Sequence, residues 1–233
     1  MAGSHLDANL ELLAGETRAL VDTVAALRPE DLAAPTLCPG WSRAHVITHV
    51  ARNADALDNL LHWARTGERR DAYGSEEQRA AAIEEGAGRG PSELLADLTD
   101  SAQRFATHAV DLRGPAGQAE VLTRTGTPVR GDQVPTMRLL EVVVHHVDLL
   151  AGYTFADSDP GFVQRTLRRA ARTAGAGGLD LRLRTPDGQE LPVGAGTGPV
   201  VTGSPADLLL WLVRGRAERL THDIPLPDPP PFA

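Results

Sequence analysis

Cysteine is almost absent from the sequence: Cys38 is the single one among 233 residues. One thiol excludes a disulfide within the chain and a zinc site built from several cysteines. Cys38 precedes Pro39 and Gly40 at the expected start of a helix, where we interpret it as a small apolar residue at a turn rather than a catalytic thiol. Thiol chemistry would therefore need a sulfur atom from another molecule.

Lysine is absent as well, so all 23 basic residues are arginine, and 31 acidic residues bring the net charge to -8. An acidic balance argues against nucleic acid as the main partner. No apolar run approaches the roughly 18–20 residues of a membrane span, and Met1–His5 lack the basic and apolar segments of a secretory signal. The sequence predicts a cytoplasmic protein with no membrane partner.

The first two thirds of the chain carry a helical pattern. Apolar residues recur at helical spacing in four long segments, which indicates a four-helix bundle over residues 1–153. A short exposed helix is expected at 75–85, a loop near the mouth of any site at 66–74, and a loose hairpin at 121–130. The four long helices are predicted at residues 5–27, 41–63, 91–110 and 135–150.

The remaining residues, 154–233, predict a small α+β domain, so the fold class of the whole chain is α+β. A strictly alternating strand at 179–184 precedes the turn signal Pro186-Asp-Gly188 and a returning strand at 189–193. A third strand is expected at 199–202, and all of these strands are expected to be antiparallel. One helix is predicted before the strands, and a second, capped by Ser204, after them.

The segment Leu139–Leu150 is the predicted central helix, because apolar residues cover well over half of its circumference. Its polar sector holds Glu141 and His145, which are four residues apart and share one face. His49 lies at the edge of the apolar ridge of the 41–63 helix. Two histidines and a carboxylate form the ligand set of a catalytic zinc or similar site. The alternative is a solvated or salt-bridged stripe.

Other polar residues on these helices receive structural roles. His45 is expected to point towards solvent, and His146 is interpreted as a satisfied core histidine. Asp148 is expected to orient a neighbouring side chain. His5 is interpreted as incidental, and His108 as a surface residue near a helix C-terminus.

Three segments, Thr36–Leu57, Glu141–Asp148 and Thr202–Arg216, resemble the mycothiol-dependent maleylpyruvate isomerase family, part of the wider DinB-like metalloenzymes. The resemblance covers nearly the whole chain. It implies a DinB-like bundle for residues 1–153 and a sterol-carrier-like α+β domain for residues 154–233.

The resemblance also implies a divalent metal, usually zinc, held by His49, Glu141 and His145, with mycothiol as the thiol cosubstrate. The implied reaction converts maleylpyruvate to fumarylpyruvate: a thiolate adds to the double bond, the resulting single bond rotates, and the thiolate leaves. A metal ion would deprotonate the thiol and stabilise the enolate. The absence of lysine is typical of G+C-rich coding and fits an actinobacterial source, where mycothiol is made.

A dicarboxylate substrate needs a cation, and arginine binds carboxylates through two parallel hydrogen bonds. The resemblance implies Arg216, which stands in a Gly-Arg context, while Arg214 and Arg219 lie close by. The alternative is a set of exposed arginines at a helix end. Arg52 and Arg138, each beside a ligand helix, are further candidates.

Two other functions fit the same metal motif. One is a metal-dependent transferase that moves mycothiol, or another low-molecular-weight thiol, onto an electrophile. The other is a non-catalytic, metal-stabilised module that binds an apolar ligand. In either enzyme the partners are a small-molecule substrate and a thiol, and a monomer is favoured.

Overall fold

The computed structural model describes residues 2–232, with side chains from residue 5 onwards. The chain divides into two compact units, Met1–Gly152 and Tyr153–Ala233. Helices dominate the first unit, whereas the second combines helices with a four-stranded sheet. The structure therefore confirms the predicted α+β class.

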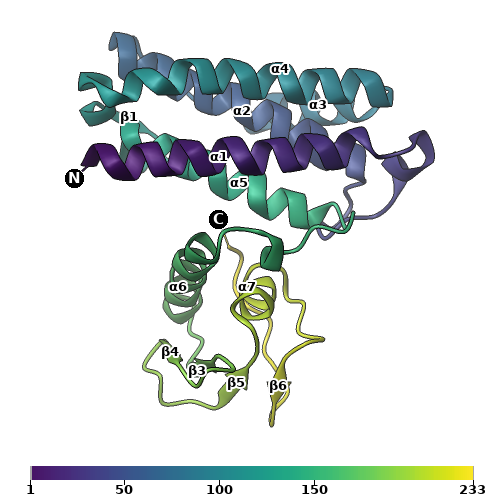
Figure 1. The fold of residues 1–233 in the computed structure, drawn as a ribbon, viewed down its shortest axis with the longest axis vertical. Coiled ribbons are helices and arrows are strands. Elements are labelled where there is room, and N and C mark those ends of the chain that lie inside the picture. Colours follow the sequence, from purple (N-terminus) through teal and green to yellow (C-terminus); the bar gives the residue numbers. More distant parts are fainter. Residues whose placement is uncertain (1, 233) are drawn as a thin grey trace. The chain divides into compact units, whose positions relative to one another are not determined.

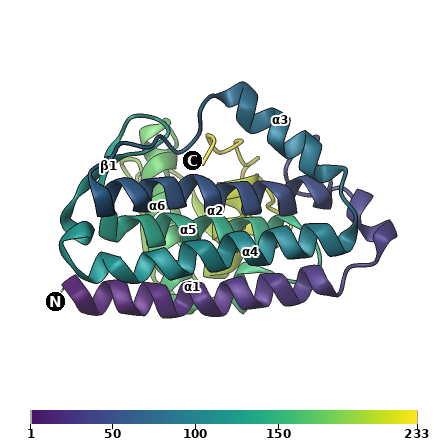
Figure 2. The ribbon, with the colours of Figure 1, turned by 90° about the horizontal axis from the view of Figure 1, so that it is seen from above.

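Four long helices lie side by side in the first unit (Figures 1 and 2). α2 packs against α4, α5 and α3, while α1 packs against α4 and α5, so the core is shared by all of them. Leucines at positions 20, 60, 98 and 139 are almost fully buried there. The long helices are α1 (Ala2–Ala25), α2 (Arg43–Thr66), α4 (Pro91–Ala109) and α5 (Val134–Asp148).

None of the helices in the described part of the chain combines the length and the apolar character needed to cross a membrane.

The beginning of α2 is tied to the end of α5 through Arg43. Its guanidinium donates to the carbonyl oxygens of Leu149 and Leu150, each at 2.7 Å. A cation at a helix C-terminus offsets the partial negative charge of the last carbonyl groups. This contact fixes how the two helices meet.

α3 (Glu76–Ala87) differs from the exposed helix that the sequence predicts, because one of its faces packs on α2. Ile83 is buried in this contact. Gly86 allows the close approach, since a Cβ there would lie 2.3 Å from Cγ2 of Thr48. The sequence pattern missed this contact because a single isoleucine among alanines and charged residues gives a weak apolar stripe.

The predicted hairpin between α4 and α5 is present. β1 (Glu120–Leu122) and β2 (Pro128–Arg130) pair antiparallel, with Val121 opposite Val129. Gly126, at φ 78°, supplies the left-handed residue of the turn. The chain then enters α5, the helix that carries two of the predicted ligands.

In the second unit, α6 (Pro160–Ala176) and α7 (Pro205–Arg214) pack together on one side of a sheet with the order β4-β3-β5-β6 (Figure 1). Phe162 and Trp211 are buried in this core. Ser204 caps α7 as predicted, since its hydroxyl accepts a hydrogen bond from the backbone N–H of Asp207. The strands are β3 (Leu181–Arg184), β4 (Glu190–Val193), β5 (Val200–Thr202) and β6 (Thr221–His222).

Two features of this sheet correct the sequence-based expectation. β3 and β4 form the expected antiparallel hairpin, but β5 pairs parallel to β3, with Val201 opposite Leu183. The chain therefore passes from β4 to the other edge of β3 and runs in the same direction. β6, which pairs antiparallel to β5, was not predicted because two residues are too few to show an alternating pattern.

Replacing Leu98 with alanine should lower the free energy of unfolding by about 2–5 kcal/mol, because a fully buried leucine leaves a cavity. Leu95, on the same helix, is only half-buried, so Leu95→Ala should cost clearly less. Urea denaturation of both variants measures the difference. Equal losses would contradict the position of Leu98 in the core.

Candidate metal centre

The structure brings His49, Glu141 and His145 together. His49 comes from α2, and the other two residues come from one face of α5. His49 Nε2 lies 3.1 Å from Glu141 Oε2 and 3.0 Å from His145 Nε2. The distance between His145 Nε2 and Glu141 Oε2 is 3.4 Å. These three residues, called the triad below, form a group that could hold a metal ion.

The triad fits a divalent ion. Ligand atoms around tetrahedral zinc stand 2.0–2.2 Å from the metal, which places neighbouring ligand atoms about 3.3 Å from each other. The three measured separations lie close to this value. Three protein ligands also leave a coordination position open, as in catalytic rather than structural zinc sites.

His145 is held by a buried carboxylate behind it. Its Nδ1 lies 2.8 Å from Oδ2 of Asp148, which is fully buried, and the Cys38 thiol donates to the same oxygen at 3.3 Å. This contact keeps the proton on Nδ1 and turns Nε2 towards the triad, as carboxylate partners do for metal-binding histidines. The predicted orienting role of Asp148 matches this geometry, and Cys38 supports it.

Cys38, His145 and Asp148 also lie close enough to count as a second possible ligand group. Their contacts are already explained by hydrogen bonds, since Asp148 accepts from both neighbours. His145 takes part in this group through Nδ1 and in the triad through Nε2. The triad is therefore the better candidate for a metal.

The charge states of the triad follow from burial and hydrogen bonding. Burial lowers the pKa of His49 to about 4, against the opposing effect of Glu141. Burial alone would raise the pKa of Glu141, but hydrogen bonds from His145 and His49 hold it well below its usual value. Burial opposes protonation of His145, yet Asp148, Cys38 and Glu141 raise its pKa well above the ordinary value. His145 must therefore lose a proton before its Nε2 can bind a metal.

A tyrosine and an arginine that the sequence analysis did not single out adjoin the triad. Arg79 Nη2 lies 3.3 Å from His49 Nδ1, and the Arg79 guanidinium stands 5.7 Å from the centre of the Tyr73 ring. Tyr73 belongs to the polar segment expected as a loop near the site, and Arg79 to α3. Neither residue stands in a periodic pattern, so only the fold shows that Arg79 reaches His49 and that Tyr73 lies against Arg79.

The two candidate arginines on the ligand helices, Arg52 on α2 and Arg138 on α5, differ in their burial and in their partners. Arg52 forms ion pairs with Asp97 and, at 3.2 Å, with Asp55, which explains it as a link between α2 and α4. Arg138 is buried, and its Nη1 donates to the backbone oxygen of Val50 at 2.7 Å and to Oδ1 of Asn53 at 2.8 Å. Arg138 therefore joins α5 to α2 beside the triad.

Other predicted residues lie outside the triad. His146 is a buried core histidine, as predicted, with Nε2 2.8 Å from the Thr23 hydroxyl. His45 faces away from the triad and lies 3.3 Å from the exposed Glu84. Arg216 belongs to the second unit, where it follows the left-handed Gly215 at the end of α7. Its half-exposed side chain pairs with Glu218 at 2.8 Å.

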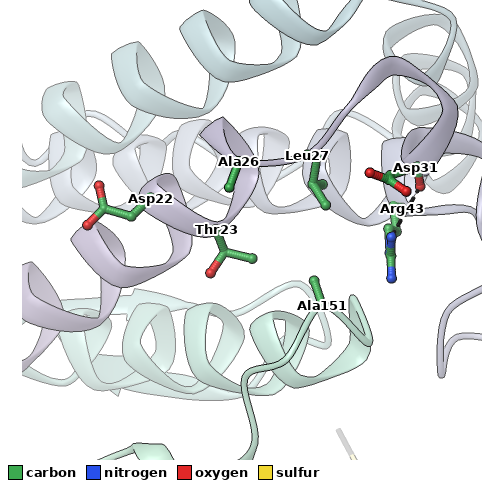
Figure 3. Close-up of a pocket in the computed structure, with 7 residues that line it drawn as sticks. All are labelled: Asp22, Thr23, Ala26, Leu27, Asp31, Arg43 and Ala151. Carbon is green, nitrogen blue, oxygen red and sulfur yellow. Dashed lines mark hydrogen bonds between the residues drawn. The ribbon is translucent and has the colours of Figure 1, made fainter.

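A shallow hollow near the end of α1 contains none of the predicted ligands (Figure 3). Two of its polar side chains already have structural partners: Thr23 contacts His146, and Arg43 binds the carbonyl groups at the end of α5. We therefore assign it no function. It is lined by Asp22, Thr23, Ala26, Leu27, Asp31, Arg43 and Ala151.

A helical bundle in which two histidines and a carboxylate converge, followed by a small α+β unit, is the arrangement that the family resemblance implies. The chain belongs to the mycothiol-dependent maleylpyruvate isomerase family, since the family model "Mycothiol maleylpyruvate isomerase N-terminal domain" matches residues 13–150. The family resemblance found in the sequence is therefore confirmed. This family consists of enzymes.

Two solved structures resemble the whole chain. The crystal structure of the mycothiol-dependent maleylpyruvate isomerase is 30% identical, with a TM-score of 0.91. A crystal structure of such an isomerase with a histidine-to-alanine substitution is 29% identical, with a TM-score of 0.89. Each match covers 97% of this chain and 97% of the other. No curated protein matches the chain.

In metal-free protein, Asp148→Asn should lower the pKa of His145, because it replaces the charged acceptor that contributes most to raising it with a neutral amide. The histidine ring signals in an NMR titration report this pKa. Asp58→Asn is the matched control, since Asp58 contacts His108 at 2.7 Å and not the triad. An unchanged His145 pKa in Asp148→Asn would contradict the role of the buried carboxylate.

Proposed function

We propose that this protein is a metal-dependent cis–trans isomerase of maleylpyruvate-like substrates that uses mycothiol as its thiol. The observation that carries the proposal is the convergence of His49 Nε2, Glu141 Oε2 and His145 Nε2 at separations of 3.0–3.4 Å. The family and the similarity to the solved isomerases support the reaction and the thiol.

His49, Glu141 and His145 would hold the ion, zinc being our proposal. When bound, such an ion lowers the pKa of a coordinated thiol and polarises a substrate oxygen. In the reaction, the thiolate sulfur forms a bond to one alkene carbon and leaves again after rotation, so no atom is gained or lost overall.

The chain's own residues prepare this chemistry. Asp148 fixes the orientation of His145, and Glu141 offsets one of the two positive charges of the ion. Burial of His49 keeps water from one side of the triad. Arg138, with its bonds to Val50 and Asn53, holds α5 against α2 and thereby keeps the ligand atoms close.

We also propose Arg216 as a residue that binds a carboxylate of the substrate. This role rests on the resemblance of its Gly-Arg context to the family. Its side chain is 53% exposed and its present partner, Glu218, is exposed too. Exposed pairs contribute little stability, so the guanidinium can exchange this partner for a substrate.

Glu141→Ala and His49→Ala should each lose most of the bound metal while staying folded, because two remaining ligands cannot retain the ion. Protein purified without a metal-binding tag, supplied with zinc and measured by plasma mass spectrometry, tests this. His45→Ala, on the same helix as His49, is the control and should keep about one zinc per chain. Full occupancy in both triad variants would show that the ligand assignment is wrong.

Conversion of maleylpyruvate to fumarylpyruvate should require both the metal and added mycothiol, and removal of either should abolish turnover. Product analysis by chromatography distinguishes the alternatives. A stable thiol conjugate without isomerised product would identify a transferase. A bound apolar ligand, with no dependence on thiol, would identify a binding module and refute the isomerase.

A further inference from the structure

Arg79 is the cation that approaches the triad most directly, although it is not one of the proposed ligands. It projects from α3, and its Nη2 atom lies 3.3 Å from His49 Nδ1. The side chain is 22% exposed, so it lies between the buried triad and solvent. Its ion pair with Glu76 spans 4.0 Å, which leaves most of its charge without a close carboxylate. Arg79 is therefore held by contacts that a stronger acceptor can displace.

The contact between Arg79 and His49 depends on which ring nitrogen of His49 carries the proton. A neutral imidazole has one N–H, so Nδ1 accepts from Arg79 only when the proton is on Nε2. A metal ion on Nε2 moves the proton to Nδ1. Two donors, His49 Nδ1–H and Arg79 Nη2–H, then face each other across 3.3 Å. An oxygen that accepts from both would resolve this conflict.

At His145, metal binding does not bring two hydrogen-bond donors face to face. Its Nδ1 faces the carboxylate of Asp148, the kind of partner that a metal-bound histidine normally has. The group that faces Nδ1 of His49 is a guanidinium instead. With the metal in place, an acceptor from another molecule can bridge His49 Nδ1–H and Arg79, and the arginine favours an anion.

Arg138 adds a second positive charge to this region. Both of its hydrogen-bond partners are neutral, and its buried Nη2 atom has no partner. Arg138 and Glu141 lie three residues apart on α5, and the charges of Arg79, Arg138 and Glu141 all act on the half-buried Tyr73. A divalent ion on the triad, Arg79 and Arg138 would together bring four positive charges, against one negative charge each from Glu141, Asp148 and Glu76, which lies 4.0 Å from Arg79. Asp55, another carboxylate that acts on Arg138, is paired with Arg52 and Arg104. Such a region attracts a dianion rather than a neutral substrate.

Tyr73 keeps Arg79 in position. The guanidinium lies over the Tyr73 ring, and this contact holds the side chain towards His49 rather than out in solvent. Tyr73 itself belongs to the polar segment after α2, and α3 begins three residues later. A tyrosine from the connection before α3 and an arginine from α3 therefore lie together on the His49 side of the triad.

From these contacts we propose that Arg79 binds a carboxylate group of the substrate next to the metal triad, with Tyr73 as its positioning residue and Arg138 as a buried fixed charge. This inference rests on the proposed function, which it extends from the reaction to recognition of a dianionic substrate. One carboxylate oxygen would accept from Arg79 Nη2 and from His49 Nδ1–H together. It assigns the first unit its own carboxylate-binding residue, separate from Arg216.

The test uses zinc-loaded full-length protein with maleate as a probe, by isothermal titration calorimetry. Arg79→Gln should weaken maleate binding on the order of 10- to 100-fold, the range expected for loss of a charged hydrogen bond. Arg79→Lys should weaken it less, because it keeps the charge but loses the planar fork. Arg69→Gln, in the connection before α3 and exposed, should bind as the unmodified protein does. Zinc content should be equal in all four proteins.

Kinetics give a second readout. Arg79→Gln should raise KM for maleylpyruvate and leave KM for mycothiol unchanged, and Tyr73→Leu should act in the same direction to a smaller extent. Unchanged maleate affinity in Arg79→Gln, no maleate binding by the unmodified protein, or loss of zinc in Arg79→Gln would each overturn the inference. If the unmodified protein shows no isomerase activity but binds maleate through Arg79, the proposed reaction fails and the carboxylate site stands.

Discussion

The packing of α2 against α5 is the constraint on which the site depends. Two of the proposed ligands share one face of α5, but His49 reaches them only because α2 lies at a fixed distance and rotation. Arg138 holds this contact from inside, with Nη1 bonded to Val50 and Asn53. Arg43 holds it at one end, through the carbonyl groups of Leu149 and Leu150. Two arginines that join helices thus set the geometry of a site to which neither contributes a ligand.

The two groups of residues next to the triad, Asp148 with Cys38 and Tyr73 with Arg79, have different physical roles. The buried Asp148 and the part-buried Cys38 form a hydrogen-bonded support behind His145, where a misplaced polar group would be costly. Tyr73 and Arg79 face the other side and remain half-buried. The site is therefore rigid where an ion would be bound and more adaptable where a substrate would enter.

Much of the site could be predicted from the sequence because helical spacing is a local property. Glu141 and His145 are four residues apart, so a helix places them together whatever surrounds it. His49 needed the additional knowledge that two helices pack, which the resemblance supplied. Arg79 and Tyr73 could not be found in this way, because the approach of Arg79 to His49 depends on the packing of α3, and Tyr73 belongs to a non-periodic connection.

In the second unit, too, the features with a local sequence signal could be predicted, and those that depend on the path of the chain could not. The alternation of Leu179–Arg184 and the turn at Pro186-Asp-Gly188 predict a strand and a hairpin correctly, since both signals are local. The parallel pairing of β5 with β3 depends on where the chain crosses between them, and β6 has only two residues. Neither the parallel pairing nor the two-residue strand produces a recognisable pattern in a short stretch of sequence.

Gly86 influences the position of Arg79 from two helical turns away. Arg79 and Gly86 are seven residues apart, two helical turns, so they lie on the same side of α3. The missing side chain lets α3 press against Thr48, one residue before His49. A larger residue at this position would lift the helix and carry the guanidinium away from the imidazole. The contact between Arg79 and His49 thus depends on the absence of a side chain at Gly86, two turns further along the helix.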